Sequence, residues 1–398
     1  MKKILYISFL NEDIRSGYKQ KIHGEYQAFI ENGLSGMLII VGNRGIKQYT
    51  GKDKNPIIID FIKKRKKVER NIYDELRTLK QWVDIVRKRV DDYQPDFIYI
   101  RRIVPITPKL ISLINFIKSK NIKIVYEYPT LPWENEILQK PNKRLKEYIF
   151  FLLDKLQFNK LEKKVDLITY MGNYNGNNKK YVHLTNCGNC SFYKLKNNNH
   201  SNDIIRFIGV AHVTYWHGYD VLIDAINKYY KEGGNKKIYF DIVGNINPSL
   251  QLQKKVSDYG LEKYVIFHGE KEGKELDKLI DKADIGVNAL RHVDIAEACK
   301  YGVTTLKTIE YTFRGMKQLS SAPIAISDNR KDMPPFIYIT DLNININNII
   351  RFYENCKVSE KEIRLYAENN LSWTREMNRV INLLEKENTN NENNVKVI

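Results

Sequence analysis

Short runs of β-branched and aromatic residues recur along the chain, and each is followed by a segment with apolar positions at helical spacing. The first runs are KILYISF, MLIIVG, FIYIRR, KIVYEY, LITYMG and YVHLT. The later ones are IIRFIGVA, KIYFDIVG, YVIFHG, IGVNAL, PIAIS and FIYIT. Strands that are apolar throughout are typical of parallel sheets covered by helices on both faces. Two such sets predict an α/β protein of two doubly wound, Rossmann-like domains.

The pattern breaks at residues 193–203, YKLKNNNHSND, which are polar, rich in Asn and without periodicity. We interpret this stretch as the linker between an N-terminal domain, residues 1–195, and a C-terminal domain, residues 203–371. Residues 372–388 predict an amphipathic helix that must pack somewhere after the last strand, and we expect it to cross back onto the first domain. The Asn-rich residues 389–398 predict a disordered tail.

A basic amphipathic helix is predicted over residues 142–165. We expect its apolar stripe to face the core and its lysines to face solvent. The alternative is a helix that lies on an anionic membrane, to which the lysines would in either case attract the protein. The stripe consists of Leu145, Tyr148, Ile149, Leu152, Leu153 and Leu156.

The composition adds a strong positive charge. The 398 residues include 65 Lys and Arg against 47 Asp and Glu, a formal net charge of +18. Such an excess favours nucleic acid, an anionic membrane or a phosphate-bearing ligand as partner, although abundant Lys, Asn and Ile also fit a biased base composition. The chain shows no interleaved aromatic motif or known module for nucleic acid, so we expect no nucleic-acid partner.

Neither a membrane span nor a metal site is expected. The opening MKKILYISFL is too short for a signal peptide, and no apolar run approaches the ~20 residues that span a bilayer. We therefore expect a cytoplasmic protein that is at most peripheral to the inner face of the cell membrane. Cys187 and Cys190 form a C-x-x-C after His183, but Cys299 and Cys356 are isolated, so a tetrahedral zinc site lacks its second pair.

Three stretches place candidate chemistry at the carboxyl ends of expected strands, where open α/β sheets bind ligands. RFIGVAHVTYWHGYD puts Gly209 where a phosphate could approach the backbone, and His217 could add a donor. SGYKQKI puts Gly17 after the first strand. YEYPTLPWENE puts Glu127 at a strand end, as a base or a hydroxyl acceptor. The alternatives are ordinary strand–Gly–loop turns and a solvated loop glutamate.

A fourth stretch, GVTTLKTIEYTFRG, combines a helix start with two charges. Thr304 or Thr305 can cap the helix, whose free N–H groups and partial positive charge suit a diphosphate. Lys307 lies in the first turn, where a cation is unfavourable beside the helix dipole unless an anion offsets it. Glu310 lies one turn on, where its two oxygens could accept two ribose hydroxyls. The alternative is a surface pair between Lys307 and Glu310.

Together and in this order, these stretches, with DFIYIRR and the C-terminal SW helix, resemble retaining GT-B glycosyltransferases of family 4. The resemblance is to the bacterial capsule and surface-polysaccharide branch, and it spans nearly the whole chain. It implies a hexosyltransferase with a nucleotide-sugar donor, expected to be UDP-linked, in the C-terminal domain. It also implies a saccharide acceptor, expected to be lipid-linked, in the N-terminal domain, and transfer with retention and without a metal or other cofactor.

The resemblance also assigns roles to individual residues. Glu310 matches the ribose-binding glutamate of the family, and Lys307 matches the lysine common in LK-x-x-EY. Thr304 and Thr305 match the phosphate-facing helix start. At Gly302 the family often has an acid that faces the sugar, so the stretch indicates a nucleotide better than any particular sugar.

Charge on the leaving nucleotide would be stabilised by Lys307, His217 and Arg291, by the electrostatic logic of an oxyanion hole. His217 stands in place of one member of a basic pair that often grips the diphosphate. With Gly302, this departure supports a first alternative, a non-catalytic GT-B subunit that binds nucleotide or glycan. A second alternative is a sugar-nucleotide epimerase.

Overall fold

The chain forms two compact units in a computed structural model. The first unit is Met1–Leu184 with Trp373–Ile398, and the second is Thr185–Ser372. The division precedes the stretch 193–203 that the composition suggested as a linker. The structure describes residues 1–13, 16–61, 72–129, 131, 145–172, 178–197, 203–292, 300–328 and 330–395.

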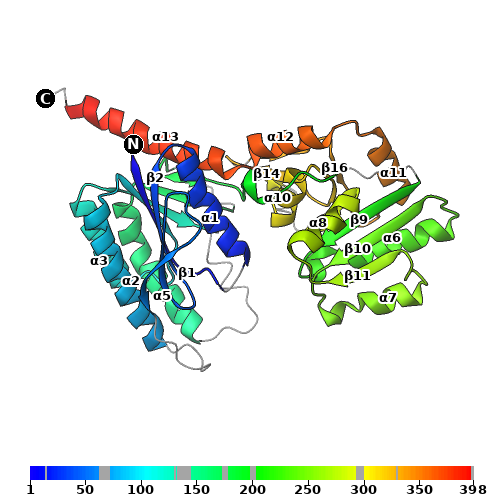
Figure 1. The fold of residues 1–398 in the computed structure, drawn as a ribbon, viewed down its shortest axis with the longest axis horizontal. Helices are drawn as coiled ribbons and strands as arrows, with labels where there is room; N and C mark the ends of the chain where they lie inside the picture. Colours follow the sequence, from blue (N-terminus) through cyan, green and yellow to red (C-terminus); the bar gives the residue numbers. More distant parts are fainter. Residues whose placement is uncertain are drawn as a thin grey trace. The chain divides into compact units, whose positions relative to one another are not determined.

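The first unit is built on one twisted sheet of eight strands in the order β4-β3-β2-β1-β5-β6-β7-β8 (Figure 1). All neighbours are parallel except β2–β3 and β3–β4, which are antiparallel. The strands are β1 (Lys3–Asn11), β2 (Ser35–Val41), β3 (Gly45–Thr50), β4 (Ile57–Phe61), β5 (Phe97–Arg101), β6 (Lys123–Tyr128), β7 (Leu167–Tyr170) and β8 (Tyr181–His183).

Helices cover both faces of this sheet because its central strands are apolar on both sides. One face packs against α2, α3 and α5, and the other against α1, on which α13 lies (Figure 1). The return of the C-terminal helix to the first unit is therefore confirmed. Helix α13 is helical through Val395, where we predicted a disordered tail. The helices are α1 (Ser16–Glu31), α2 (Ile72–Tyr93), α3 (Pro108–Ser119), α5 (Leu145–Lys164) and α13 (Trp373–Val395).

The second unit has a six-stranded sheet that is parallel throughout, in the order β11-β10-β9-β12-β13-β16. A separate antiparallel pair is formed by β14 (Ile324–Ile326) and β15 (Arg330–Asp332). The strands of the large sheet are β9 (Ile204–Val210), β10 (Lys237–Val243), β11 (Val265–Gly269), β12 (Ile285–Val287), β13 (Lys317–Ser320) and β16 (Ile337–Ile339).

Helices also sandwich the second sheet, which gives this unit the predicted Rossmann-like form. Helices α6, α7 and α11 pack on one face, and α8 and α10 on the other. Helix α12 packs against α10 (Figure 1). The helices are α6 (Tyr219–Lys231), α7 (Leu252–Asp258), α8 (Gly273–Lys282), α10 (Leu306–Phe313), α11 (Ile346–Asn355) and α12 (Glu360–Asn370).

Two predictions about elements are wrong. The run PIAIS does not enter the parallel sheet but forms β14 of the antiparallel pair, and the polar KQLS takes the place beside β12 as β13. Gln318 of β13 is fully buried, and its amide is satisfied by Asn288 and Thr312. Three residues of the predicted core stripe of α5 face solvent instead, namely Ile149, Leu152 and Leu156. Leu153 is half-buried, and the side chains of Leu145 and Tyr148 lie outside what the structure describes.

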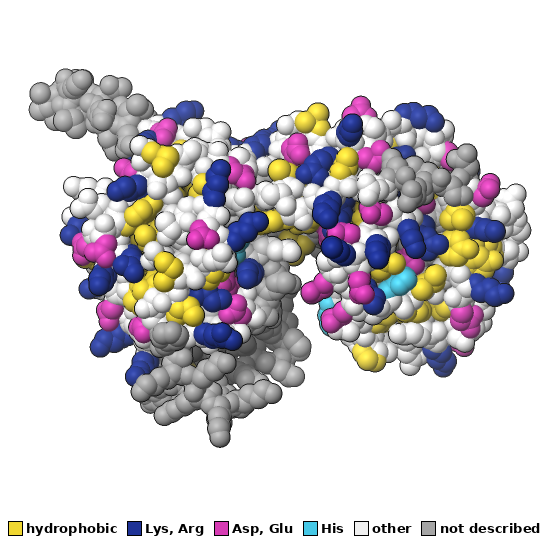
Figure 2. All heavy atoms as spheres, viewed as in Figure 1, with side chains coloured by type: hydrophobic (Ala, Val, Ile, Leu, Met, Phe, Trp, Pro, Cys, Tyr) yellow, Lys and Arg dark blue, Asp and Glu magenta, His cyan; other side chains and the backbone are white. Residues whose placement is uncertain are grey.

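Charge is spread over both units. Figure 2 shows Lys and Arg side chains scattered across the visible faces, with Asp and Glu side chains between them. None of the helices in the described ranges is long and apolar enough to cross a membrane.

Candidate anion-binding site

The candidate site lies at the switch point of the second sheet. Strand β9 has β10 on one side and β12 on the other, so the connections that leave β9 and β12 diverge there. Backbone hydrogen bonds hold the two connections together at this end. The N–H of Leu290 donates to the carbonyl of His217 (3.1 Å), and that of Arg291 to the carbonyl of Trp216 (3.3 Å). The segment after β12 leads on to helix α10.

Helix α10 begins at Leu306, as predicted, with Thr305 as its N-cap. The Thr305 hydroxyl accepts a hydrogen bond from the N–H of Thr308 (3.1 Å), and the carbonyl of Thr305 accepts from the N–H of Ile309 (3.1 Å). The N–H groups of Leu306 and Lys307 precede these bonds, and amides at this position have no acceptor within a helix. The helix start therefore offers two amide donors and the positive end of its dipole.

Thr304 is used for structure rather than for capping. Its hydroxyl donates to the carbonyl of Ala325, and its own carbonyl accepts from the side chain of Asn186 (3.1 Å). The first bond ties the entrance of α10 to β14, and the second ties it to the segment after β8. Of the two threonines, only Thr305 presents its side chain to the helix start.

Gly302 is required by the backbone. Its φ is +79°, a left-handed value that side chains other than glycine rarely adopt. A Cβ at this position would stand 2.7 Å from the amide nitrogen of Ala325 and 2.8 Å from the carbonyl carbon of Ile324. The acid that the resembling family often carries at this position would not fit the turn as it is built here.

Lys307 is a cation without a carboxylate partner among the residues described. Burial lowers the pKa of its ammonium to about 8. The surface pair with Glu310 that we considered as an alternative does not form, because Glu310 binds Arg314 instead. A half-buried cation at the positive end of a helix is unfavourable by itself, so the position of Lys307 favours an anion as the ligand of a site here.

His217 stands close to this cation as a neutral donor. Burial, and then the charge of Lys307, lower the pKa of its imidazole to about 4. The N–H of Thr214 donates to His217 Nδ1 (2.9 Å), which assigns the imidazole proton to Nε2. His217 therefore offers a neutral N–H donor at neutral pH.

Sequence reasoning missed His292. Burial, and then the charge of Lys307, lower the pKa of this imidazole as well. His292 lies a few residues after the end of β12, and the sequence there, NALRH, contains no glycine or known ligand-binding motif. Only the strand-end rule applied to IGVNALRH could have identified it.

Glu310 lies on α10 with one oxygen engaged. Its Oε1 accepts from Arg314 Nε (3.0 Å), and Arg314 also binds Asp277 (2.8 Å). Burial raises the pKa of the Glu310 carboxyl, and Arg314 partly offsets this. Arg314 thus holds the carboxylate by Oε1, and Oε2 makes no hydrogen bond within the described residues.

Two other predicted residues have structural roles. Arg291 is held by Asp220 and lies over the ring of Tyr215, 4.4 Å from its centroid. A Cβ on Gly209 would stand 2.5 Å from the ring of Tyr219, so this glycine makes room for a core aromatic. Neither residue needs a ligand to account for it.

In the first unit, Glu127 is buried rather than exposed at its strand end, with 1% of the residue accessible. It accepts from Arg101 Nη1 (3.0 Å) and binds Lys21 (2.9 Å), with the carboxyl of Glu25 nearby. Burial alone would raise the pKa of Glu127, but Arg101 and Lys21 lower it. A buried, ion-paired carboxylate fits a structural role better than that of a general base. Gly17 lies in the first turn of α1.

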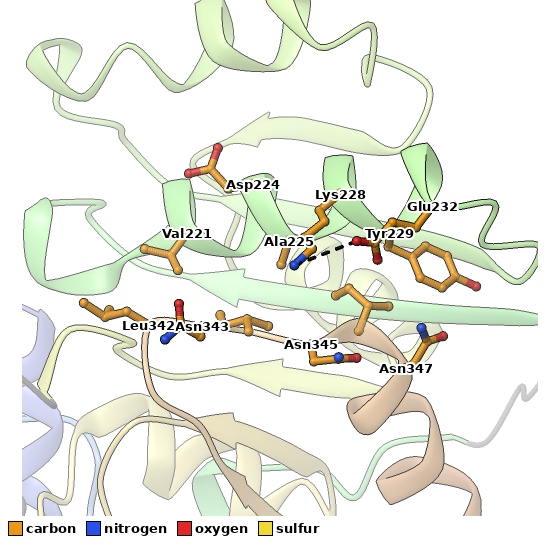
Figure 3. Close-up of a pocket in the computed structure, with 12 residues that line it drawn as sticks. Val221, Asp224, Ala225, Lys228, Tyr229, Glu232, Leu342, Asn343, Asn345 and Asn347 are labelled. Atoms are coloured by element: carbon orange, nitrogen blue, oxygen red, sulfur yellow. Dashed lines mark ion pairs between the residues drawn. The ribbon is translucent and has the colours of Figure 1, made fainter.

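A separate groove in the second unit holds none of the predicted residues. It has a volume of about 540 Å³ and lies between α6 and the segment 342–347 (Figure 3). Its walls are polar, and two of its side chains, Lys228 and Glu232, face each other as an ion pair of 3.8 Å. The candidate site is thus distinct from this groove.

Comparisons with known proteins agree with this picture. Residues 194–298 match the family model "Glycosyl transferases group 1". No curated protein matches the sequence. The fold is similar to a glycosyltransferase from Rickettsia africae (TM-score 0.60, 13% identity, 96% of this chain and 98% of that one). It is also similar to sucrose-phosphate synthase from Thermosynechococcus elongatus (TM-score 0.60, 12% identity, 97% of this chain and 100% of that one).

A third solved structure, Anabaena HepE in complex with UDP-glucose, is similar over 97% of this chain and 100% of that one, with a TM-score of 0.53 and 12% identity. Identities this low show the fold alone. The two Rossmann-like units therefore form a GT-B fold. The matched family segment begins before β9 and includes the Gly209 and His217 loop and β12, while Lys307 and Glu310 lie beyond it.

Proposed function

We propose that this chain is a glycosyltransferase that binds a nucleotide-sugar at the anion site of its second unit and transfers the sugar to a saccharide acceptor. The observation that carries the proposal is Lys307 at the start of α10, which has no carboxylate partner among the described residues and lies one turn before Glu310, at the switch point of a GT-B fold. The group 1 family match over residues 194–298 and the UDP-glucose bound by the similar Anabaena structure support it.

Each part of the site has a role in this proposal. The first amides of α10 and the ammonium of Lys307 bind the diphosphate and stabilise the charge that develops on it as the sugar leaves. His217 Nε2–H adds a neutral donor to the same group. Oε2 of Glu310 accepts a ribose hydroxyl, while Arg314 fixes the carboxylate through Oε1.

The finer points rest on the resemblance in sequence. We propose a UDP-linked hexose as donor, retention at the anomeric carbon, and transfer without a metal cofactor. The acceptor would be a lipid-linked saccharide bound by the first unit, in the assembly of a bacterial capsule or another surface polysaccharide. The net charge of +18 fits an acceptor at an anionic surface.

The test is a transfer assay on a panel of UDP-sugars and saccharide acceptors, followed by mass spectrometry. We expect one acceptor to gain one sugar and UDP to be released. Lys307→Gln and Glu310→Ala should lose this activity, and Glu310→Ala should also lose nucleotide-sugar binding. Lys228→Gln should retain both, because Lys228 is exposed on α6 (73% of the side chain) and belongs to the separate groove.

Two outcomes would overturn the proposal in favour of the alternatives. Epimerised UDP-sugar formed without an acceptor would indicate an epimerase. Binding of UDP-sugar without turnover across the panel would indicate a non-catalytic subunit.

A further inference from the structure

Helix α5 carries apolar residues on two opposite faces. The face that is buried also contains one carboxylate, and the other face is exposed to solvent. The inward positions recur every three to four residues, as the spacing of about 3.6 residues per turn requires. The outward positions follow the same period half a turn away, and there Ile149, Leu152 and Leu156 are 45%, 42% and 70% exposed. The inward residues are Phe151, Asp154, Phe158 and Leu161.

Asp154 fixes the rotation of the helix. Its carboxylate accepts from Arg102 Nη2 (2.7 Å) and from the N–H of Ile106 (2.5 Å), and 1% of the residue is accessible. Arg102 in turn lies over the ring of Tyr128, 5.0 Å from its centroid. Turning the outward leucines into the core would remove Asp154 from Arg102 and from the N–H of Ile106, and it would leave these buried donors without that acceptor, so the apolar face stays in solvent.

Lysines continue the same outward line toward the end of the helix. At about 100° per residue, Lys160 and Lys163 follow Leu152 and Leu156 on one face, and Lys155 flanks them. All three lysines are exposed. Lys160 and Lys163 make no ion pair within the part of the chain that the structure describes. The described part of this face is thus apolar from Ile149 to Leu156 and cationic from Lys160 to Lys163.

An anionic lipid surface fits this face better than a second copy of the chain. A two-fold contact with the two helices parallel would bring the lysines of both copies together, which is repulsive, and an antiparallel contact would set the lysines of each copy against the apolar residues of the other. Three apolar side chains also fall far short of the ~800 Å² that a stable interface buries on each partner. Apolar residues with flanking lysines on one exposed helix face are the chemistry that binds a helix flat on acidic headgroups.

We propose that the outward face of α5 docks the protein on an anionic bilayer. Ile149, Leu152 and Leu156 enter the boundary between headgroups and acyl chains, and Lys160 and Lys163 bind the acidic headgroups. This proposal does not depend on the proposed enzymatic function, because it concerns a different unit and a different ligand.

The test is sedimentation of the full chain with vesicles of 30% phosphatidylglycerol in phosphatidylcholine and with phosphatidylcholine alone. The wild type should bind the anionic vesicles, and its affinity should fall as salt rises. Lys160→Gln with Lys163→Gln should weaken binding about 30-fold, from about 1 kcal/mol for each lysine near the surface. Leu152→Gln with Leu156→Gln should weaken it about tenfold or more.

Matched controls lie in the second unit. Leu365→Gln replaces a leucine that is 54% exposed, and Lys228→Gln replaces an exposed lysine, so both should bind vesicles as the wild type does. A thermal melt of each variant shows that it folds. Wild-type protein that ignores anionic vesicles, or α5 variants that bind as tightly as the controls, would overturn the proposal. So would leucine variants that dissociate a dimer in sedimentation equilibrium without any change in vesicle binding.

Discussion

Lys307 has a protonation state that the site itself controls. Burial brings the pKa of its ammonium down to about 8, since no carboxylate among the described residues compensates for the lost hydration. The folded pKa lies below the unfolded value, so this group favours folding more as pH rises above about 8. A bound anion stabilises the charged ammonium, so the affinity of the site for an anion should fall as pH rises through the pKa of Lys307.

Affinity for UDP should therefore fall as pH rises from 7 to 9. With a pKa of about 8, roughly nine-tenths of Lys307 is charged at pH 7 and one-tenth at pH 9, so a site that needs the charge loses affinity about tenfold. Calorimetry at the two pH values measures this. Lys307→Arg keeps its charge and should show no such loss. A wild-type affinity that does not change between pH 7 and 9 would contradict the role of Lys307.

The sequence indicated some site residues and misled on others for physical reasons. Lys307 could be identified because its local position, a cation in the first turn of a helix, is unfavourable without a ligand. Glu127 could not be judged locally. Its partners Lys21 and Arg101 come from other elements, and only the folded sheet brings them within 3.0 Å of its carboxylate.

At the scale of elements, the turn before α10 is set by its fit against β14. Gly302 combines a left-handed backbone with close approach to the backbone of Ile324 and Ala325. The same turn carries Thr304, whose hydroxyl binds the carbonyl of Ala325. The position of the α10 start therefore depends on this contact.

Gly302→Ala should destabilise the second unit by more than a left-handed alanine alone costs. That cost is about 1–2 kcal/mol, and the contact of 2.7 Å with the amide of Ala325 adds to it. Gly260→Ala is the matched control, since Gly260 has φ +64° and nothing within 4 Å of its would-be Cβ. Thermal unfolding of both variants gives the comparison. Equal losses of stability in the two variants would show that a Cβ at position 302 makes no unfavourable contact with β14.

Element types followed from the apolar pattern where most positions of a strand are apolar and buried, as in β1, β9 and β10. The apolar pattern predicted the wrong element or face where polar side chains are buried and hydrogen-bonded to other residues. Strand β13 contains Gln318, which is satisfied by side chains distant in sequence. Helix α5 buries Asp154, so the face that carries a carboxylate is the inner one.

At the scale of the whole molecule, the two units have the same architecture but different electrostatics at their strand ends. In the first unit, Lys21 and Arg101 are neutralised by Glu25 and Glu127. In the second, Lys307 has no such carboxylate among the described residues. The fold could be predicted from the sequence in both cases, whereas this contrast could not, because it depends on which side chains meet.

The proposed function requires an anionic nucleotide to bind at the start of α10. Calorimetric titration of the full chain with UDP at pH 7 tests this most directly. We expect binding by the wild type and by Lys228→Gln, and at least tenfold weaker binding by Lys307→Gln, since charge-assisted bonds contribute about 1.5–3 kcal/mol. Equal affinity in the wild type and Lys307→Gln would contradict the account.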